Sequence, residues 1–300
     1  MVDRLVFEDR AYIQSRTDSA GGRGINASHV LHSFGAETLA IVTSGGANGE
    51  RLQKLAAKSG FPVKVVSIKN EIRVNLTITD RQGLGVKLNE RGPVIAKEEL
   101  ARVEKAVENR LDSASWLMLC GSIPPGVSPD FYTKLIRMAR ERKVKTLLDT
   151  DGEALLHGVE AGPTVVTPNQ AEAERLLNRG LITRAQFMDA VTRIKAMGPE
   201  SVLLFLGTRG VIAVNENQLL EVIPPRIDVV SPLCSSDALA AAFVWAANKK
   251  KDFADCVRWG VAAGTASASM PGTDFATLEQ TKEIYKVVEV RKTQQAATHA

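Results

Sequence analysis

The chain has 300 residues, and its 44% hydrophobic and 24% charged content is typical of a globular protein with one large α/β domain or two smaller ones. The formal net charge is +4, but no basic stripe with aromatic residues occurs, which argues against nucleic-acid binding. No apolar run reaches the length of a membrane span, and the first residues lack a secretory pattern. Cys120, Cys234 and Cys256 are too far apart to suggest a disulfide framework or a zinc site. We therefore expect a cytoplasmic protein without a nucleic-acid or membrane partner.

The first 92 residues are divided into short elements by glycine-rich turns. The predicted elements are, in chain order, a strand at 2–7, a helix at 27–34, a strand at 39–43, a helix at 50–59 and strands at 63–68 and 72–79. A turn at 80–83 follows the last of these strands, which is typical of a hairpin. We expect residues 63–92, with parts of 1–20, to form a small antiparallel sheet inserted into the main domain.

From residue 97 onward, short apolar strands alternate with amphipathic helices. The predicted strands are 116–120, 145–149, 164–167, 201–206 and 211–215, and the predicted helices are 98–111, 129–142, 170–178, 186–197 and 253–270. This alternation predicts a parallel sheet covered by helices on both faces, with ligands bound beyond the carboxyl ends of the strands. The last helix is rich in Gly and Ala and can pack closely against its neighbour, whereas residues 291–300 are expected to form a loose tail.

The stretch SPLCSSDALAAAFVWAAN at 231–248 predicts a buried helix with a polar start. Unpaired backbone N–H groups and the helix dipole make such a start an anion site. The N–H groups of Cys234, Ser235 and Ser236 could hold a transferring phosphate while Asp237 takes a proton from a hydroxyl. Taken alone, the stretch fits better an aspartate that caps a core helix.

Two glycine-containing loops carry polar side chains. GGRGIN at 21–26 offers Arg23 for a phosphate or carboxylate and Asn26 for sugar hydroxyls, although a tight turn with a solvated arginine fits equally well. GSIPPG at 121–126 follows a predicted buried strand, which favours a binding loop in which Ser122 donates to an anion. A rigid Pro-Pro turn without a ligand is the alternative for this second loop.

Two further loops follow predicted strands. In PNQAE at 168–172, Asn169 and Glu172 fit a capping box, and they also fit a magnesium site that is bridged by water. LGTRG at 206–210 is placed to lie along a nucleotide. His29 and His32 share a helix face without a carboxylate or cysteine, so packing is favoured over metal binding.

These loops together resemble the ribokinase/PfkB family of carbohydrate kinases, in order and over nearly the whole chain. They are most similar to the branch that acts on phosphorylated ketohexoses, the phosphofructokinases and tagatose-6-phosphate kinases. The matching segments are GGRGIN (21–26), IRVN (72–75), LNERGP (88–93), CGSIPPG (120–126), DTDGEAL (149–155), PNQAE (168–172) and SPLCSSDA (231–238). The last of these segments falls where the family carries its GAGD signature.

The resemblance implies one ribokinase-like domain over 1–300, with a three-layer αβα arrangement, a central mostly parallel sheet and a small antiparallel β lid that can also make a homodimer contact. It implies ATP-dependent, Mg²⁺-dependent phosphorylation of fructose 1-phosphate, fructose 6-phosphate or tagatose 6-phosphate. The implied roles are Asp237 as catalytic base, Cys234, Ser235 and Ser236 as anion hole, Asp3, Gly22, Arg23, Asn26, Arg73 and Ser122 in substrate binding, Gly207 and Gly210 in nucleotide binding, and Asn169 and Glu172 at the metal.

Two departures from the family pattern matter. The family usually opens with a strand before the aspartate matched by Asp3, so a central strand is expected to be missing or replaced by another segment. Cys234, Ser235 and Ser236 replace Gly-Ala-Gly, and loss of one preorganised donor can cost ~2.7–4 kcal/mol of transition-state stabilisation. A rival hypothesis is therefore an impaired relative that senses sugar phosphate or nucleotide. A kinase of an unphosphorylated sugar or nucleoside is disfavoured by Arg23 and Arg73 together.

Overall fold

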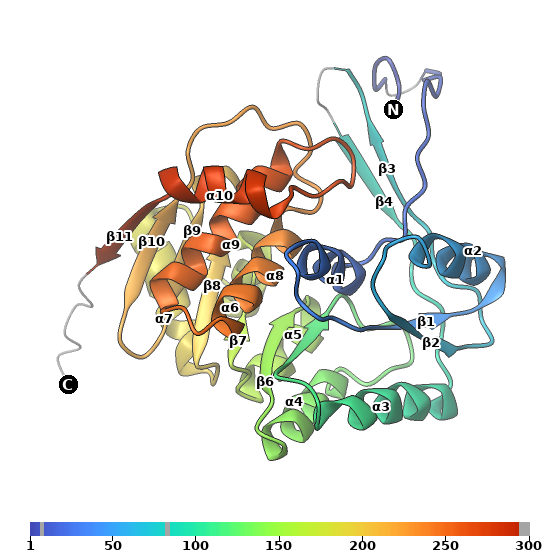
Figure 1. Cartoon of the computed structure of the whole chain (residues 1–300), viewed down its shortest axis with the longest axis horizontal. Helices are drawn as coiled ribbons and strands as arrows, with labels where there is room; N and C mark the ends of the chain where they lie inside the picture. The colour runs from blue at the N-terminus through green and yellow to red at the C-terminus, as the bar shows by residue number, and fades with distance from the viewer. Residues whose placement is uncertain (7–8, 82–84, 294–300) are drawn as a thin grey trace. The chain divides into compact units, whose positions relative to one another are not determined.

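The computed structural model describes residues 1–6, 9–81 and 85–293, and these residues form two compact units. The first unit comprises Met1–Gly21, Leu39–Ala106 and Pro124–Val127, and the second comprises the other described residues. Figure 1 shows the helices and strands of both units. No helix in the described part of the chain is long and apolar enough to cross a membrane.

The second unit is built on a seven-stranded sheet with the strand order β11-β10-β9-β8-β7-β6-β5 (Figure 1). Four neighbouring strands are parallel: β5 (Trp116–Cys120), β6 (Lys145–Asp149), β7 (Val165–Val166) and β8 (Ser201–Phe205). Three strands extend the sheet in antiparallel pairs: β9 (Val211–Val214), β10 (Leu219–Ile223) and β11 (Glu289–Thr293). Most residues of β6, β7 and β8 are buried, as a sheet covered on both faces requires.

Helices form a layer on each face of this sheet, which gives the predicted three-layer arrangement (Figure 1). One layer contains α1 (Arg23–Ser33), α8 (Ser235–Asn248), α9 (Phe253–Ala268) and α10 (Leu278–Val287). The other contains α4 (Phe131–Glu141), α5 (Gly152–Glu160), α6 (Gln170–Leu177) and α7 (Arg184–Ala196). The alternation of strands and helices expected from residue 97 onward is confirmed as far as β8, whereas β9 and β10 follow without an α-helix between them and pair antiparallel.

Helix α8 is apolar over most of its length, and its residues Asp237–Ala246 are all buried. Two glycines of α9 let the two helices approach closely. A Cβ atom at Gly264 would lie 2.8 Å from the carbonyl oxygen of Ser235, and one at Gly260 would lie 3.0 Å from that of Leu239. The predicted close packing of the Gly- and Ala-rich helix is confirmed, and it holds the start of α8 in place.

Aromatic contacts join α1 to α8. The Trp245 indole donates a hydrogen bond to the carbonyl oxygen of Phe34 at 3.1 Å, and the two rings meet edge to face at 5.5 Å. The His29 ring packs 5.3 Å from the ring of Phe275, and burial together with the charge of His32 lowers the pKa of His29. The Trp245–Phe34 contacts hold α1 and α8, two helices that carry predicted site residues, against each other, and the His29–Phe275 contact joins α1 to the segment before α10.

The first unit contains two small sheets. β1 (Ala40–Ser44) and β2 (Val63–Ser67) form a parallel pair, and β3 (Asn75–Thr79) and β4 (Gly85–Asn89) form an antiparallel ribbon. The unit also contains α2 (Gly46–Ala56) and the start of α3 (Lys97–Leu111). The antiparallel sheet predicted over 63–92 was therefore wrong in its first strand, because β2 pairs with β1 in parallel instead. Residues 82 and 83 of the predicted turn lie outside the described residues.

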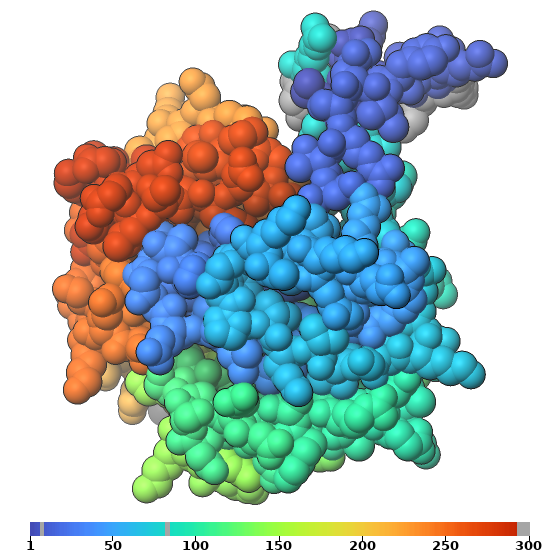
Figure 2. All heavy atoms as spheres, turned by 45° about the vertical axis from the view of Figure 1, so that its right-hand side comes forward, coloured from blue at the N-terminus to red at the C-terminus, as the bar shows by residue number. Residues whose placement is uncertain are grey.

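The N-terminal segment lies beside the β3–β4 ribbon, as Figure 2 shows for the two segments in blue and cyan. The strand predicted at 2–7 is wrong in the residues described, because Val2 makes only isolated bridges with Ile13 and Asp80. The Val2 N–H donates to the Thr79 carbonyl at 2.9 Å. Position 7 lies outside the described residues.

The two edges of the large sheet also differ from simple expectation. Residues 291–293 belong to β11, which pairs with β10, so the predicted loose tail does not begin at Arg291. Residues 294–300 of that tail lie outside the described part of the chain. At the other edge, no described strand pairs with the outer side of β5, whose side chains are mostly half-buried. The sequence predicts that a central strand is missing or replaced by another segment.

Candidate active site

The predicted loops of the second unit meet at the carboxyl edge of the parallel strands. Cys120 at the end of β5 pairs with Asp149 at the end of β6, and Asn169 bridges to Phe205 at the end of β8. Parallel strands end at the same edge of a sheet, so the segments that follow them lie together. This edge is where the polar site residues gather.

Asp237 lies in the first turn of α8 with only 5% of its surface exposed. The side-chain amide of Asn26, from α1, donates to its carboxylate at 2.6 Å. The same amide nitrogen lies 3.7 Å from the Cys234 sulfur. A hydrogen bond to a carboxylate stabilises its charged form and orients its second oxygen. The structure thus joins the predicted base to a predicted sugar-binding residue that is 211 positions away.

No side chain caps the start of α8, where Cys234 is the N-terminal boundary residue. The Ser235 hydroxyl oxygen is buried and has no hydrogen-bond partner among the described residues. An uncapped start of a buried helix presents backbone N–H donors and the positive end of the dipole. Cys234, Ser235 and Ser236, which were predicted to form an anion hole, thus lie at this uncapped helix start.

Arg23 is the first residue of α1 and follows Gly22, whose φ of 122° favours glycine. Its guanidinium donates to Asp149 at 2.7 Å and to Glu172 at 3.0 Å, and it lies 3.5 Å from Asp151. Arg23 was predicted to hold a substrate phosphate. In the structure its two terminal nitrogens face carboxylates of this chain.

Asp149 is a buried acid at this edge with a strongly raised pKa. Burial raises its pKa to about 7, and the charges of Asp237 and Glu172 add to the shift, although Arg23 opposes it. One of its oxygens is bound by Arg23, and the other is buried without a hydrogen-bond partner. Burial lowers the pKa of Arg23, but the charges of Asp149 and Glu172 outweigh burial and raise it overall. The site is therefore a dense arrangement of like charges held by one arginine.

Asn169 and Glu172 form a complete capping box at the start of α6. The Asn169 side chain accepts from the Glu172 N–H at 2.9 Å, and the Glu172 carboxylate accepts from the Asn169 N–H at 2.8 Å. The capping alternative is confirmed. Within the described residues, no group of three or more His, Cys, Asp or Glu side chains is arranged to hold a metal ion.

The other predicted residues are more dispersed. Ser122 follows β5 in the second unit, and Gly207 and Gly210 frame a short 3₁₀ turn after β8. Asp3 and Arg73 belong to the first unit, where Asp3 is exposed and pairs with Arg81 at 3.0 Å.

Sequence reasoning did not single out Asp149 or Tyr132. Asp149 could have been found, because it is a carboxylate at the carboxyl end of a predicted strand. The Tyr132 hydroxyl lies 3.0 Å and 2.9 Å from the carbonyl oxygens of Cys120 and Gly121. It supports the loop that carries Ser122, and no local sequence pattern indicates this contact.

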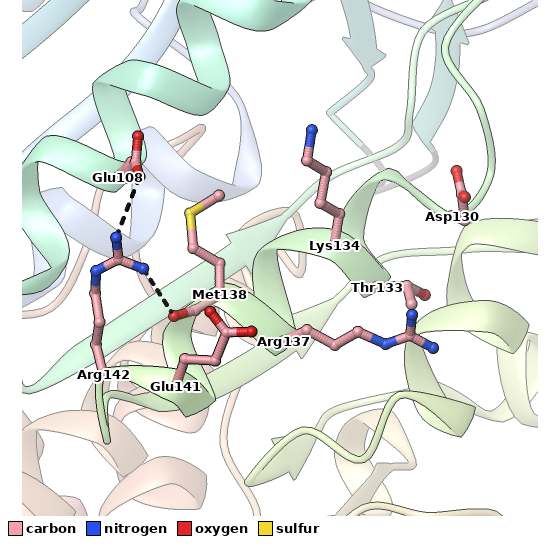
Figure 3. Close-up of a pocket in the computed structure, with 8 residues that line it drawn as sticks. All are labelled: Glu108, Asp130, Thr133, Lys134, Arg137, Met138, Glu141 and Arg142. Carbon is pink, nitrogen blue, oxygen red and sulfur yellow. Dashed lines mark hydrogen bonds and ion pairs between the residues drawn. The ribbon is translucent and has the colours of Figure 1, made fainter.

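A surface hollow of about 470 Å³ lies beside α4 (Figure 3). Its lining is Glu108, Asp130, Thr133, Lys134, Arg137, Met138, Glu141 and Arg142. Arg142 is engaged by Glu108 at 3.2 Å and by the Met138 carbonyl at 3.4 Å. The lining mixes acidic and basic side chains, and it contains none of the predicted site residues.

Comparisons with known proteins identify the family of the chain. Residues 1–280 match the model of the pfkB family of carbohydrate kinases, so the chain belongs to that family. It is 31% identical over 268 residues to the ATP-dependent 6-phosphofructokinase isozyme 2 of Escherichia coli strain K12, covering 88% of this chain and 86% of that protein. It is 25% identical over 271 residues to the 1-phosphofructokinase of Vibrio cholerae, covering 90% and 86%.

A solved structure shows the same fold. The phosphofructokinase-2 of Escherichia coli in complex with substrates and products has a TM-score of 0.88 and 29% identity to this chain, covering 95% of this chain and 93% of that one. The ribokinase-like α/β fold and the family resemblance expected from the sequence are thereby confirmed.

Proposed function

We propose that the protein phosphorylates a hydroxyl group of a phosphorylated ketohexose with ATP as the phosphoryl donor. The observation that carries the proposal is Asp237, a buried carboxylate at an uncapped helix start that is held by Asn26. Family membership and two relatives named as phosphofructokinases support the reaction class. Fructose 6-phosphate and fructose 1-phosphate are the first candidate acceptors, and tagatose 6-phosphate is the third by resemblance.

In the proposed reaction, Asp237 takes the proton of the acceptor hydroxyl as the sugar oxygen forms its bond to the γ-phosphorus of ATP. The bond between that phosphorus and the oxygen of ADP breaks, and the proton remains on Asp237 until it is lost to solvent. Backbone N–H groups of Cys234, Ser235 and Ser236 at the start of α8 stabilise the charge on the transferring phosphate. Asn26 orients the carboxylate.

The carboxylates behind this helix start fit a magnesium ion. Asp149 and Glu172 are buried, and one Asp149 oxygen has no partner in the described structure. Mg²⁺ uses one or two carboxylates together with water and substrate phosphates, so Glu172, Asp149 and, through water, Asn169 would hold it. When bound, the ion supplies positive charge to the phosphate oxygens.

The remaining assignments belong to the same proposal. Arg73, Arg23 and Ser122 hold the phosphate of the substrate, Asp3 and Asn26 bind sugar hydroxyls, and Gly22 lets the backbone approach the sugar. Gly207 and Gly210 lie along ATP. Two arginines suit a dianionic phosphate, which a nonphosphorylated sugar would not need.

The β3–β4 ribbon is proposed as the lid and as a homodimer contact. Leu76 and Leu88 face each other across the ribbon and are 48% and 50% exposed. Paired apolar side chains on a two-stranded ribbon favour burial against another surface, here a second copy of this chain. A cytoplasmic location, where ATP is plentiful and thiols stay reduced, completes the proposal.

A coupled ADP-release assay over fructose 6-phosphate, fructose 1-phosphate, tagatose 6-phosphate and ribose tests the function. We expect turnover on at least one ketohexose phosphate and none on ribose. Binding of sugar phosphate or ATP without turnover on any acceptor would favour the sensor hypothesis. Turnover on ribose alone would refute the proposed substrate class.

A further inference from the structure

The contacts of Arg23 have a chemical meaning beyond the proposed reaction. Its guanidinium joins two buried carboxylates from different elements, Asp149 at the end of β6 and Glu172 in the first turn of α6. The side chains of these acids are 4% and 3% exposed. Two buried like charges this near to one cation depend on it for compensation, because water cannot solvate them.

The same carboxylates have the character of a hard-cation site. One oxygen of Asp149 is bound to Arg23, and the other is buried with no hydrogen-bond partner in the described part of the chain. Glu172 uses one oxygen for the Asn169 N–H and the other for Arg23. Arg23 therefore occupies one oxygen of each carboxylate, and a divalent ion would need these oxygens. The second Asp149 oxygen has no partner in the described structure, which indicates a further ligand that Arg23 does not supply.

We propose that Arg23 is an internal counter-cation that competes with a divalent metal ion for Asp149 and Glu172. Metal entry displaces the guanidinium, and the released Arg23 then becomes available to the phosphate of the substrate. The second step rests on the proposed function, whereas the competition itself does not. Metal binding, by releasing Arg23, raises the affinity for the sugar phosphate by some factor. Because linkage is reciprocal, binding of the sugar phosphate to Arg23 raises the affinity for the metal by the same factor.

Mn²⁺ binding to the whole protein without nucleotide or sugar tests the competition, with free Mn²⁺ measured by electron paramagnetic resonance. We expect Arg23→Ala to bind Mn²⁺ at least about tenfold more tightly than the wild type. Arg179→Ala is the matched control, because it removes the same charge from an exposed pair with Asp189 at 3.0 Å. Its Mn²⁺ affinity should equal that of the wild type. Equal affinities of wild type and Arg23→Ala would overturn the proposal.

Two further variants locate the site and guard against misfolding. Adding Glu172→Gln to Arg23→Ala should abolish the gained affinity, and persistence of tight binding would show that the metal lies elsewhere and overturn the proposal. If circular dichroism shows that Arg23→Ala is unfolded, Arg23→Lys takes its place. A lysine ammonium lacks the planar fork with which the guanidinium binds both carboxylates, so this variant should also bind Mn²⁺ more tightly than the wild type.

The coupling is tested separately with fructose 6-phosphate and fructose 1-phosphate as probes. In the wild type, the sugar phosphate should lower the Mn²⁺ dissociation constant, and in Arg23→Ala this effect should vanish. Tighter Mn²⁺ binding by Arg23→Ala without any sugar-phosphate effect in the wild type would uphold the counter-cation and refute the release step. Failure of turnover alone would refute the proposed function and leave the Mn²⁺ comparison intact.

Discussion

Replacement of Asp237 by asparagine is the most direct perturbation of the proposed chemistry. The new side chain has nearly the same shape and keeps an oxygen that can accept from Asn26, whose amide now lies 2.6 Å from the carboxylate. It cannot take a proton from a hydroxyl. General-base catalysis contributes about 10²–10⁴-fold to rate, so kcat should fall by that factor, which corresponds to about 2.7–5.5 kcal/mol.

The stability of the Asp237→Asn variant should change little, which separates a chemical role from a structural one. A negative charge in the first turn of α8 stabilises the helix by about 0.3–1 kcal/mol through the dipole. Opposing this loss, the variant relieves repulsion with buried Asp149, whose pKa the charge of Asp237 raises. We therefore expect the free energy of unfolding to stay within about 1 kcal/mol of the wild type.

The assay compares kcat from coupled ADP release with the melting temperature of the same preparations. Asp255→Asn is the matched control, because Asp255 also lies in the first turn of a helix, α9, and accepts a hydrogen bond from Tyr285 at 2.7 Å. Its kcat should equal that of the wild type. A kcat for Asp237→Asn within a factor of three of the wild type would show that Asp237 is not the base. A loss of kcat that is accompanied by a matching loss of folded protein would show that the carboxylate has only a structural role.

Three further predictions concern the loop, the ribbon and pH. Replacing Cys234 and Ser236 together by glycine should raise kcat by up to about 10²–10³-fold if their side chains obstruct the phosphate, and an unchanged kcat would show that they are tolerated. Leu76→Lys should shift the protein toward monomer in analytical ultracentrifugation, whereas Thr77→Lys on the opposite face of the ribbon should not; equal behaviour of the two would argue against the ribbon contact. The pKa of His29 is lowered by folding, so its protonation opposes folding, and stability should fall as pH drops below about 6.5. His29→Gln should show a smaller loss of melting temperature over that range, and identical pH profiles would refute this account.

Periodicity predicted the local elements well where one face or the whole segment is buried. The strands at 116–120 and 145–149 and the long apolar helix after Ser235 were found because burial imposes an apolar pattern on the sequence. Strand pairing was predicted less well. β2 looked like a hairpin partner because its neighbour in sequence is β3, but it pairs with β1.

The two ends of the chain show the same limit. Residues 291–293 were expected to belong to a loose, polar tail, but they pair with β10, about 70 positions earlier, as part of an edge strand that needs little apolar surface. Val2 was expected to start a strand because nearby residues are apolar, yet it makes only isolated bridges. Pairing partners depend on distant segments, which local patterns do not reveal.

The sequence by itself determined the family, the order of the loops and the identity of the candidate base, because each is written in consecutive residues with defined chemistry. Only the tertiary structure decided what those side chains face. Arg23 finds its partners Asp149 and Glu172 at separations of 126 and 149 residues, and Asn26 finds Asp237 at 211. Charges interact through space rather than along the chain, so the same arginine that the sequence offers to a substrate is held, in the folded protein, by two buried acids.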